Sequence, residues 1–204
     1  MSRILSVNYP EAVQMATEAL RSGALVVLPT DTVYGVASAL DHAAIERIFV
    51  AKKRPSERAI PVLLADQDAA SQVVSDFPEA ARRLAAAFWP GPLTLALPKR
   101  ADLPANLSPL PTVGVRVPGL ATTRAILAAA GGALAVTSAN RSDQPPACTI
   151  QAAIRYLSDA VTLYLDGGTC LGGVASTVVT FEDGELRIVR QGPISEAALR
   201  AVLG

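Results

Sequence analysis

The sequence predicts an α/β fold in which helices flank one mixed sheet of parallel and antiparallel strands. Helical patterns alternate with short apolar runs along most of the chain, which is the order typical of α/β proteins. Only Asp183-Gly184 separates the last two apolar runs, and this dipeptide is typical of a tight β-hairpin, whose strands are antiparallel. We therefore expect a mixed sheet in a single domain over residues 1–204.

The first half of the chain begins with a helix and a buried strand. The predicted helix over 11–22 follows Pro10 and ends at Gly23, because proline favours the first helical position and glycine the position after the last. The continuous apolar run 24–28 predicts a strand covered on both faces. The elements expected next are a helix capped by Asp41 and running to about Lys52, a strand over 62–64, and a helix over 78–88 that Trp89-Pro-Gly-Pro92 ends.

The second half repeats the alternation and closes with the hairpin. The elements expected before the hairpin are strands 93–97 and 113–117, helix 122–130, strand 134–137, helix 149–157 and strand 161–165. The hairpin pairs 177–181 with 185–189. After it, Ser195 is expected to cap a terminal helix, because its hydroxyl can accept a hydrogen bond from a backbone N–H of the first turn.

Composition supports a globular domain. Of the 204 residues, 50% are apolar and 18% are charged. A chain of this size buries about 70% of the surface that its unfolded form exposes. Its apolar content excludes a disordered protein. The longest apolar runs, 24–28 and 125–130, are much shorter than the roughly 20 residues of a membrane-spanning helix. The first residues also lack the basic start and apolar centre of a signal peptide.

Charge and residue usage exclude several classes of function. The 18 basic and 18 acidic residues balance, which argues against coating nucleic acid through bulk charge. Two cysteines, Cys148 and Cys170, cannot form a disulfide framework, so we expect a cytoplasmic protein without a zinc site. The single histidine, His42, is interpreted as an exposed residue at a helix start. The sequence contains no G-x-S-x-G, Walker A or G-x-G-x-x-G motif.

Four polar segments follow or border predicted strands, where ligand sites of α/β proteins lie. They are Leu28–Gly35, Lys52–Arg58, Thr137–Arg141 and Ser176–Thr177. Taken singly, each segment favours an ordinary turn or a solvated helix end over a ligand site. Together they supply cations and hydroxyl and amide donors without an evident side-chain nucleophile. This set favours the binding of a polyphosphate, with catalysis by positioning and charge neutralisation rather than by a covalent intermediate.

A series of ordered motifs identifies a resemblance. They are Pro29-Thr-Asp-Thr-Val-Tyr-Gly35, Lys52-Lys-Arg-Pro55, Trp89-Pro-Gly-Pro-Leu-Thr94, Val113-Gly-Val-Arg-Val-Pro118, Thr137-Ser-Ala-Asn140, Ser176-Thr-Val-Val179 and Arg190-Gln-Gly192. In these motifs, across about residues 10–195, the chain resembles the short, single-domain form of the YrdC-like threonylcarbamoyl-AMP synthases. The resemblance implies a twisted sheet of the YrdC/RibB-like type with a deep concave groove, and no second C-terminal domain.

The resemblance also implies a reaction. L-threonine, bicarbonate or CO2, and ATP would be joined into threonylcarbamoyl-AMP and pyrophosphate, a nucleotidyl transfer that serves threonylcarbamoyladenosine modification of tRNA. The carbamate oxygen is itself the nucleophile at the α-phosphorus, so no catalytic Cys or His is needed. Mg2+ would be held mainly by the ATP phosphates and not by a protein metal site. The implied partner is the tRNA threonylcarbamoyl-transfer complex, and the groove leaves room for weak tRNA binding.

Site residues follow from the same resemblance. The central tetrad would be Lys52, Arg54, Ser138 and Asn140. The threonine-binding residues would be Thr32, Arg116 and Ser176, and the ATP-binding residues Arg54, Arg58, Thr112, Ser138, Asn140 and Arg190. The chain departs from the family pattern at two positions. Lys53 replaces a small residue, and Leu63 lies near the place of a histidine that touches threonine in some members, so that contact must be missing or apolar here.

Three alternatives stay open. An RNA-binding module could use the cationic run 52–58 and Arg47, although aromatic residues make up only 4% of the chain and offer few stacking platforms. A carbamoyl-transfer domain of a larger hydrogenase-maturation protein would be accompanied by zinc-finger cysteines and further domains. A paralogue could share the groove without synthase activity, but the complete tetrad favours the synthase.

Overall fold

The computed structural model describes residues 2–170 and 172–204, and their strands form one mixed 10-stranded sheet in the order β1-β8-β2-β3-β7-β4-β6-β5-β9-β10. The strands are β1 Arg3–Ser6, β2 Val26–Leu28, β3 Gly35–Ser38, β4 Val62–Leu64, β5 Leu93–Pro98, β6 Thr112–Arg116, β7 Ala133–Ser138, β8 Leu163–Asp166, β9 Thr177–Glu182 and β10 Glu185–Arg190. Four neighbouring pairs are parallel, namely β1/β8, β2/β8, β4/β6 and β5/β9, and the others are antiparallel. The predicted mixed sheet is thus confirmed.

Every predicted strand is present, and two further strands were not predicted. β1 is a four-residue edge strand whose residues are mostly exposed, so it carries no apolar run. β3 consists of small residues and is fully buried between β2 and β7. A Cβ atom at Gly35 would lie 2.6 Å from Cγ1 of Val136, so the close approach of β3 to β7 depends on glycine at this position.

The predicted helices are also confirmed. They are α1 Ala12–Arg21, α2 His42–Lys52, α3 Glu79–Phe88, α4 Ala121–Ala129, α5 Ile150–Leu157 and α6 Glu196–Leu203, with short 3-10 helices η1 Asp68–Gln72, η2 Ala105–Leu107 and η3 Ser158–Ala160. Asp41 caps α2 by accepting a hydrogen bond from the Ala44 N–H at 2.8 Å. Ser195 caps α6 in the same way, through the Ala198 N–H at 3.2 Å.

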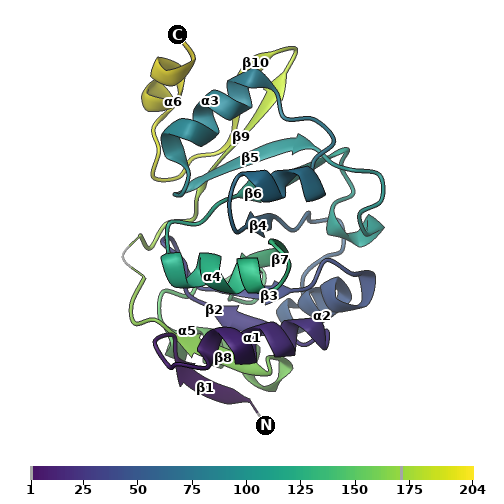
Figure 1. The fold of residues 1–204 in the computed structure, drawn as a ribbon, viewed down its shortest axis with the longest axis vertical. Helices are drawn as coiled ribbons and strands as arrows, with labels where there is room; N and C mark the ends of the chain where they lie inside the picture. The colour runs from purple at the N-terminus through teal and green to yellow at the C-terminus, as the bar shows by residue number, and fades with distance from the viewer. Residues whose placement is uncertain (1, 171) are drawn as a thin grey trace.

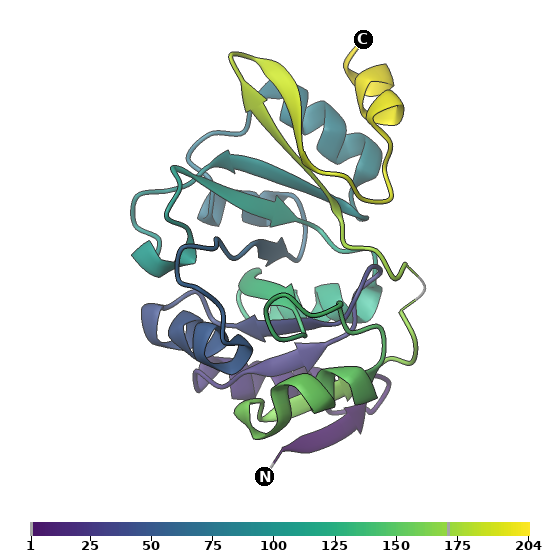
Figure 2. The same cartoon turned by 180° about the vertical axis from the view of Figure 1, so that it is seen from behind.

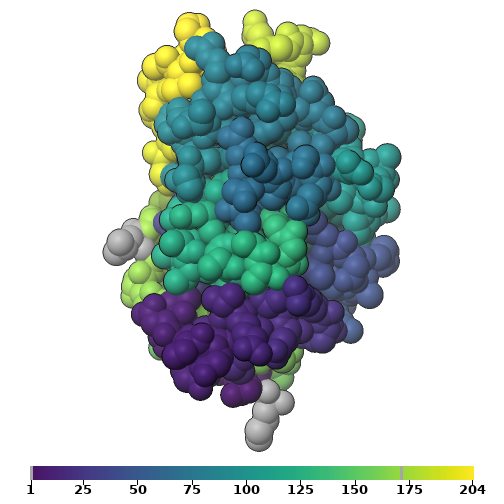
Figure 3. Space-filling view, in the orientation of Figure 1, coloured from purple at the N-terminus to yellow at the C-terminus, as the bar shows by residue number. Residues whose placement is uncertain are grey.

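Helices cover both faces of the sheet. In the half that contains β1, β8, β2, β3 and β7, α1 and α4 cover one face (Figure 1) and α2 and α5 the other (Figure 2). In the other half, α3 packs on β5 and on α6. Seen in space-filling form, the side chains of α1 and α4 form a continuous cover on their side (Figure 3). Among the described residues, no helix has the length and apolarity needed to cross a membrane.

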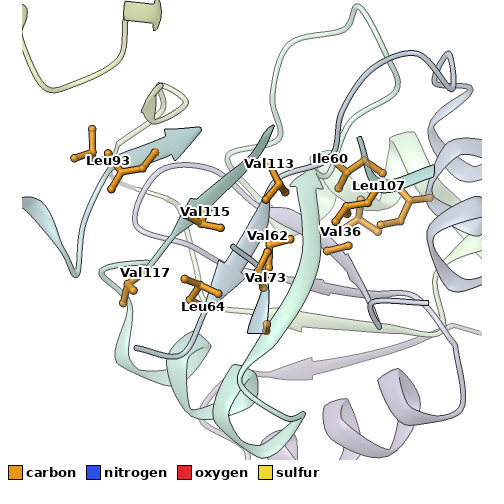
Figure 4. Packing of buried hydrophobic residues seen from close by; sticks show 14 of the residues in the cluster. Val36, Ile60, Val62, Leu64, Val73, Leu93, Leu107, Val113, Val115 and Val117 are labelled. Atoms are coloured by element: carbon orange, nitrogen blue, oxygen red, sulfur yellow. The ribbon is translucent and has the colours of Figure 1, made fainter. Parts of the chain in front are cut away.

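The core is divided by the sheet into two clusters. The larger contains Val36, Ile60, Val62, Leu64 and Val115 (Figure 4). The smaller lies under α1 and α4 and takes the side chains that point the opposite way, such as Leu63. Successive residues of a strand point to opposite faces, so alternation between two apolar clusters means that both faces of the sheet are buried.

Candidate functional site

A pocket of about 280 Å3 lies among the central strands of the sheet. Its walls come from the loop between β2 and β3, from the end of β7, and from β4, β5 and β6, so both halves of the sheet contribute. Six of the predicted site residues line it: Thr32, Arg54, Arg116, Ser138, Ser176 and Arg190. These six residues therefore share one pocket, while the deep concave groove stays a prediction.

Arg116, at the end of β6, is the most deeply buried arginine of the pocket and is 5% exposed. Its Nε donates to the Gly91 carbonyl at 2.8 Å, and its Nη1 donates to Oγ1 of Thr32 at 3.0 Å. Its Nη2 pairs with Oδ1 of Asp31 at 2.5 Å. Burial lowers the pKa of Arg116, and the charge of Asp31 opposes that shift. The guanidinium nevertheless stays charged at neutral pH, as arginine does in proteins.

Two threonine hydroxyls shape the loop beside this arginine. Oγ1 of Thr30 donates to the Val33 carbonyl at 2.6 Å and accepts from the N–H groups of Thr32 and Val33, each at 3.2 Å. Oγ1 of Thr32 lies 3.0 Å from Oγ1 of Thr30. A hydroxyl has one hydrogen, and that of Thr30 goes to Val33, so the hydrogen between the two hydroxyls comes from Thr32. The oxygen of Thr32 also accepts from Arg116, and its second lone pair stays available to a ligand donor.

Arg190, at the end of β10, is bound to Ser176, which precedes β9. Nε and Nη2 of Arg190 donate to the Ser176 carbonyl at 3.1 and 2.8 Å, and Oγ of Ser176 lies 2.8 Å from Oγ1 of Thr94. The segment after β10 crosses directly over the start of β9, where a Cβ atom on Gly192 would lie 2.2 Å from the Thr177 nitrogen. This glycine-dependent crossing brings Arg190 to the pocket.

The third arginine, Arg54, belongs to the loop after α2. Its Nη2 donates to the Ala59 carbonyl at 2.8 Å and its Nε donates to the Arg58 carbonyl at 3.3 Å. The guanidinium is therefore held by the backbone of the same loop. Burial lowers the pKa of Arg54, and the nearby charge of Arg58 adds to this effect. Ser138 ends β7 opposite Gly35 of β3 and also faces the pocket.

Lys52 and Asn140 do not line the pocket but lie next to Ser138. The Lys52 amine is buried and donates to the carbonyl oxygens of Ser138 and Asn140, and to Oδ1 of Asn140 at 3.3 Å. An ammonium group has three hydrogens, and these three oxygens accept all of them. Burial, with a contribution from the charge of Arg54, lowers the pKa of Lys52 to about 7. Lys52 thus brings the tetrad residues together by fixing the end of β7.

Arg58 and Thr112 also lie outside the pocket. Arg58 pairs with Asp143 at 2.9 Å, and both side chains are largely exposed. Thr112 begins β6, whereas the pocket residue Arg116 ends it. Because a strand rises about 3.3 Å per residue, these two positions are about 13 Å apart along β6.

Several residues in the site were not among those predicted from the sequence. Asp31 holds Arg116, and Thr94 contacts Ser176, although both belong to motifs that the sequence analysis quoted. Spacing within a motif does not show which side chain reaches a partner more than 80 residues away.

The structure also locates the two residues that depart from the family pattern. Leu63 lines the pocket and contributes an apolar side chain to its wall. Lys53 is exposed.

The pocket combines three arginine side chains with hydroxyl groups, and no Asp or Glu is among its lining residues. Such a surface is suited to anionic groups, because the guanidinium fork matches carboxylate and phosphate oxygens. Within the described residues, no group of three or more His, Cys, Asp and Glu side chains is arranged to hold a metal ion.

Comparison with known proteins supports the resemblance seen in the motifs. A family model for the Sua5/YciO/YrdC domain, described as "Telomere recombination", matches residues 18–192. A Mycobacterium leprae protein provisionally named threonylcarbamoyl-AMP synthase is 39% identical over 191 residues, which cover 93% of this chain and 86% of that protein. The Bacillus subtilis threonylcarbamoyl-AMP synthase is 35% identical over 98% of this chain, and the match covers 58% of its own length.

A solved structure agrees with this comparison. The crystal structure of Pyrococcus abyssi Sua5 complexed with L-threonine superposes with a TM-score of 0.95 and 32% sequence identity. The superposition covers 100% of this chain and 61% of that chain, so the chain spans about three-fifths of this relative.

Proposed function

The chain belongs to the Sua5/YciO/YrdC family, and from this premise we propose how its pocket acts as a threonylcarbamoyl-AMP synthase. One observation carries the proposal: three arginine side chains face a pocket that no carboxylate lines. The reaction brings together a threonine carboxylate, a carbamate and the phosphates of ATP. All of these groups are anionic, and a pocket of this composition offsets their mutual repulsion.

Threonine would bind through its carboxylate to Arg116 and through its nitrogen to Thr32. Arg116 keeps one unused N–H on each terminal nitrogen and can hold one carboxylate, while the free lone pair of Thr32 can accept a hydrogen bond from the threonine nitrogen. Ser176 lines the same pocket and would contact the remaining polar groups of the amino acid. The apolar side chain of Leu63 offers a surface for the threonine methyl group.

The first chemical step requires a neutral amine. Burial and nearby guanidinium charges both lower the pKa of the bound threonine ammonium, which favours the neutral form. Bicarbonate gives CO2 and hydroxide; the nitrogen lone pair attacks the CO2 carbon, one C–O π bond opens, and the amine proton passes to the hydroxide, leaving a carbamate and water.

In the second step a carbamate oxygen attacks the α-phosphorus of ATP, and the bond to the β-phosphate oxygen breaks to release pyrophosphate. Arg54 and Arg190 would offset the charge that develops on the departing phosphates, and Ser138 would donate a hydrogen bond to them. Mg2+ would arrive on the ATP phosphates as part of the substrate.

ATP is too large for this pocket alone. A volume of about 280 Å3 is just below the roughly 300–1,000 Å3 of typical ligand pockets. The nucleoside would therefore extend over the rim, where Arg58 and Thr112 are the predicted contacts. Lys52 and Asn140 would act by holding the turn at the end of β7 in place.

The wider setting follows from the same proposal. We place the reaction in the cytoplasm, in agreement with two unpaired cysteines and the supply of ATP there. The mixed anhydride product would pass to the tRNA threonylcarbamoyl-transfer complex, and weak tRNA binding near the pocket would assist that transfer.

The test is pyrophosphate release by the purified chain. We expect release only when ATP, Mg2+, L-threonine and bicarbonate are all present. Arg116→Lys should lower kcat/KM for threonine about 30-fold or more, because lysine cannot replace a bidentate guanidinium. The matched control is Arg200→Lys, on the surface beside Glu196, which should leave kcat/KM unchanged. No threonine-dependent pyrophosphate from the wild-type chain would refute the proposal.

A further inference from the structure

Asp31 forms an ion pair that differs from every other ion pair among the described residues. Its carboxylate and the Arg116 guanidinium are only 21% and 6% exposed, whereas the side chains of the other pairs are at least 44% exposed. Asp31 does not line the pocket. It therefore contacts Arg116 from outside the space that a ligand would fill.

The hydrogen bonds of Arg116 explain what this contact achieves. A guanidinium carries five N–H hydrogens. One on Nε goes to Gly91, one on Nη1 to Thr32 and one on Nη2 to Asp31. The two that remain belong to different terminal nitrogens, which is the arrangement that a carboxylate ligand accepts in a bidentate manner. Rotation of the guanidinium would break this division between protein and ligand.

Asp31 is itself fixed by the backbone. Its Oδ1 also accepts from the Gly119 N–H at 2.8 Å, in the turn between β6 and α4. A Cβ atom on Gly119 would lie 3.1 Å from Cγ of Asp31, so the turn and the carboxylate are in close contact. The loop after β2 is thereby joined to the end of β6, which lies in the other half of the sheet.

We propose that Asp31 is a positioning residue for substrate binding: it holds the Arg116 guanidinium in the orientation that leaves two N–H groups for the threonine carboxylate. The inference rests on the proposed function. Asp31 acts through geometry, because its Oδ1 accepts hydrogen bonds from two partners that are far apart in the sequence. The negative charge of Asp31 opposes that of a ligand carboxylate, so charge alone would weaken threonine binding and cannot be the source of the effect.

Two substitutions separate geometry from charge. Asp31→Asn removes the charge but keeps an oxygen that can accept from both partners, so the threonine Kd should stay within about threefold of wild type or fall. Asp31→Ala removes the acceptor, and the threonine Kd should rise about tenfold or more. The KM for ATP should change by less than about twofold in both variants. Asp102→Ala, which breaks the exposed ion pair with Arg100, is the matched control and should change neither value.

A third substitution guards against loss of folding in Asp31→Ala. Gly119→Ala leaves every charged group in place, but its Cβ would lie 3.1 Å from Cγ of Asp31, so the carboxylate or the turn must shift and the fit between Asp31 and Arg116 changes. We expect the threonine Kd to rise several-fold, with an unchanged KM for ATP. Titration calorimetry with threonine alone measures this affinity without turnover, so a failure here is distinguishable from a failure of pyrophosphate synthesis.

The proposal is overturned if Asp31→Ala and Gly119→Ala both bind threonine as wild type does. It is also overturned if Asp31→Asn loses as much affinity as Asp31→Ala, which would make the charge the important property. Equal losses for threonine and ATP would indicate a general structural defect and would likewise contradict it. Absence of threonine binding by a wild-type chain that still makes pyrophosphate would contradict it as well.

Discussion

Lys52 combines burial with a contact geometry that requires a charge. Its amine donates to three oxygen atoms at the end of β7, and the position of Ser138 in the pocket depends on those contacts. Burial, together with the nearby charge of Arg54, lowers the pKa of this amine to about 7. The cost of burying the ammonium is offset by its hydrogen bonds, and any change in its protonation affects both the fold and the site.

The lowered pKa makes stability depend on pH. Between about pH 7 and the unfolded value of 10.5, the unfolded chain binds a proton at Lys52 that the folded chain has released. The free energy of unfolding therefore rises with pH in this window, by at most about 1.4 kcal/mol per pH unit. Urea unfolding of wild type and Lys52→Met from pH 6 to 8.5 tests this. The wild type should gain about 1–2 kcal/mol relative to the variant above pH 7. A constant difference would show that the three oxygen contacts keep the amine charged.

Individual side chains were the hardest feature to predict from the sequence. The motifs place Lys52, Arg116 and Ser176 near one site, but not the direction in which each points. The contacts of Lys52 are with residues 86 and 88 positions away, and the partner of Arg116 is 85 positions away. Such contacts depend on the packing of complete elements, and spacing within a short motif does not contain that information.

At the scale of elements, the end of α2 carries an unfavourable conformation. Lys53 follows the helix with φ 49° and ψ 46°, the left-handed region that glycine favours. A residue with a Cβ atom pays about 1 kcal/mol for this conformation. The tight turn nevertheless directs the chain into the loop that carries Arg54, with the Arg54 N–H bound to the Phe49 carbonyl at 2.9 Å.

Lys53→Gly should therefore stabilise the protein. We expect the free energy of unfolding to rise by about 0.5–1 kcal/mol, after allowance for the greater freedom of glycine in the unfolded chain. Lys53→Ala keeps the unfavourable conformation and should be neutral or slightly destabilising, so it is the matched control. Since Lys53 does not line the pocket, pyrophosphate release should be unchanged in both variants. Equal stability of the two variants would contradict this account of the turn.

Elements with strong local signals were predictable, and elements defined by their partners were not. The helix caps at Asp41 and Ser195 are local, and both are confirmed. β1 has no apolar run because it is an exposed edge, and it exists through pairing with β8, about 160 residues later. β3 is defined by its place between β2 and β7, where a Cβ atom at Gly35 would clash with Val136.

At the scale of the whole molecule, the pocket depends on the joining of the two halves of the sheet. Thr32 follows β2 in one half, whereas Arg116 ends β6 in the other, and their side chains are hydrogen-bonded at 3.0 Å. A single sheet and a core cluster with members from both halves connect these regions. We therefore expect one cooperative unfolding transition, in which a ligand held by both halves stabilises all of the described fold.

Threonine should accordingly raise the unfolding temperature of the entire chain. At 100 times its Kd, a ligand that binds only the folded state contributes about 2.7 kcal/mol, and for a chain of 204 residues this corresponds to a shift of about 5–10 °C. L-threoninol, which lacks the carboxylate, should shift the transition by less than about 1 °C at the same concentration, because it leaves the Arg116 fork without an anionic partner. Scanning calorimetry measures both shifts and the number of transitions. Equal shifts for the two compounds would place the main contact away from the guanidinium, and two separate transitions would show that the halves of the sheet unfold independently.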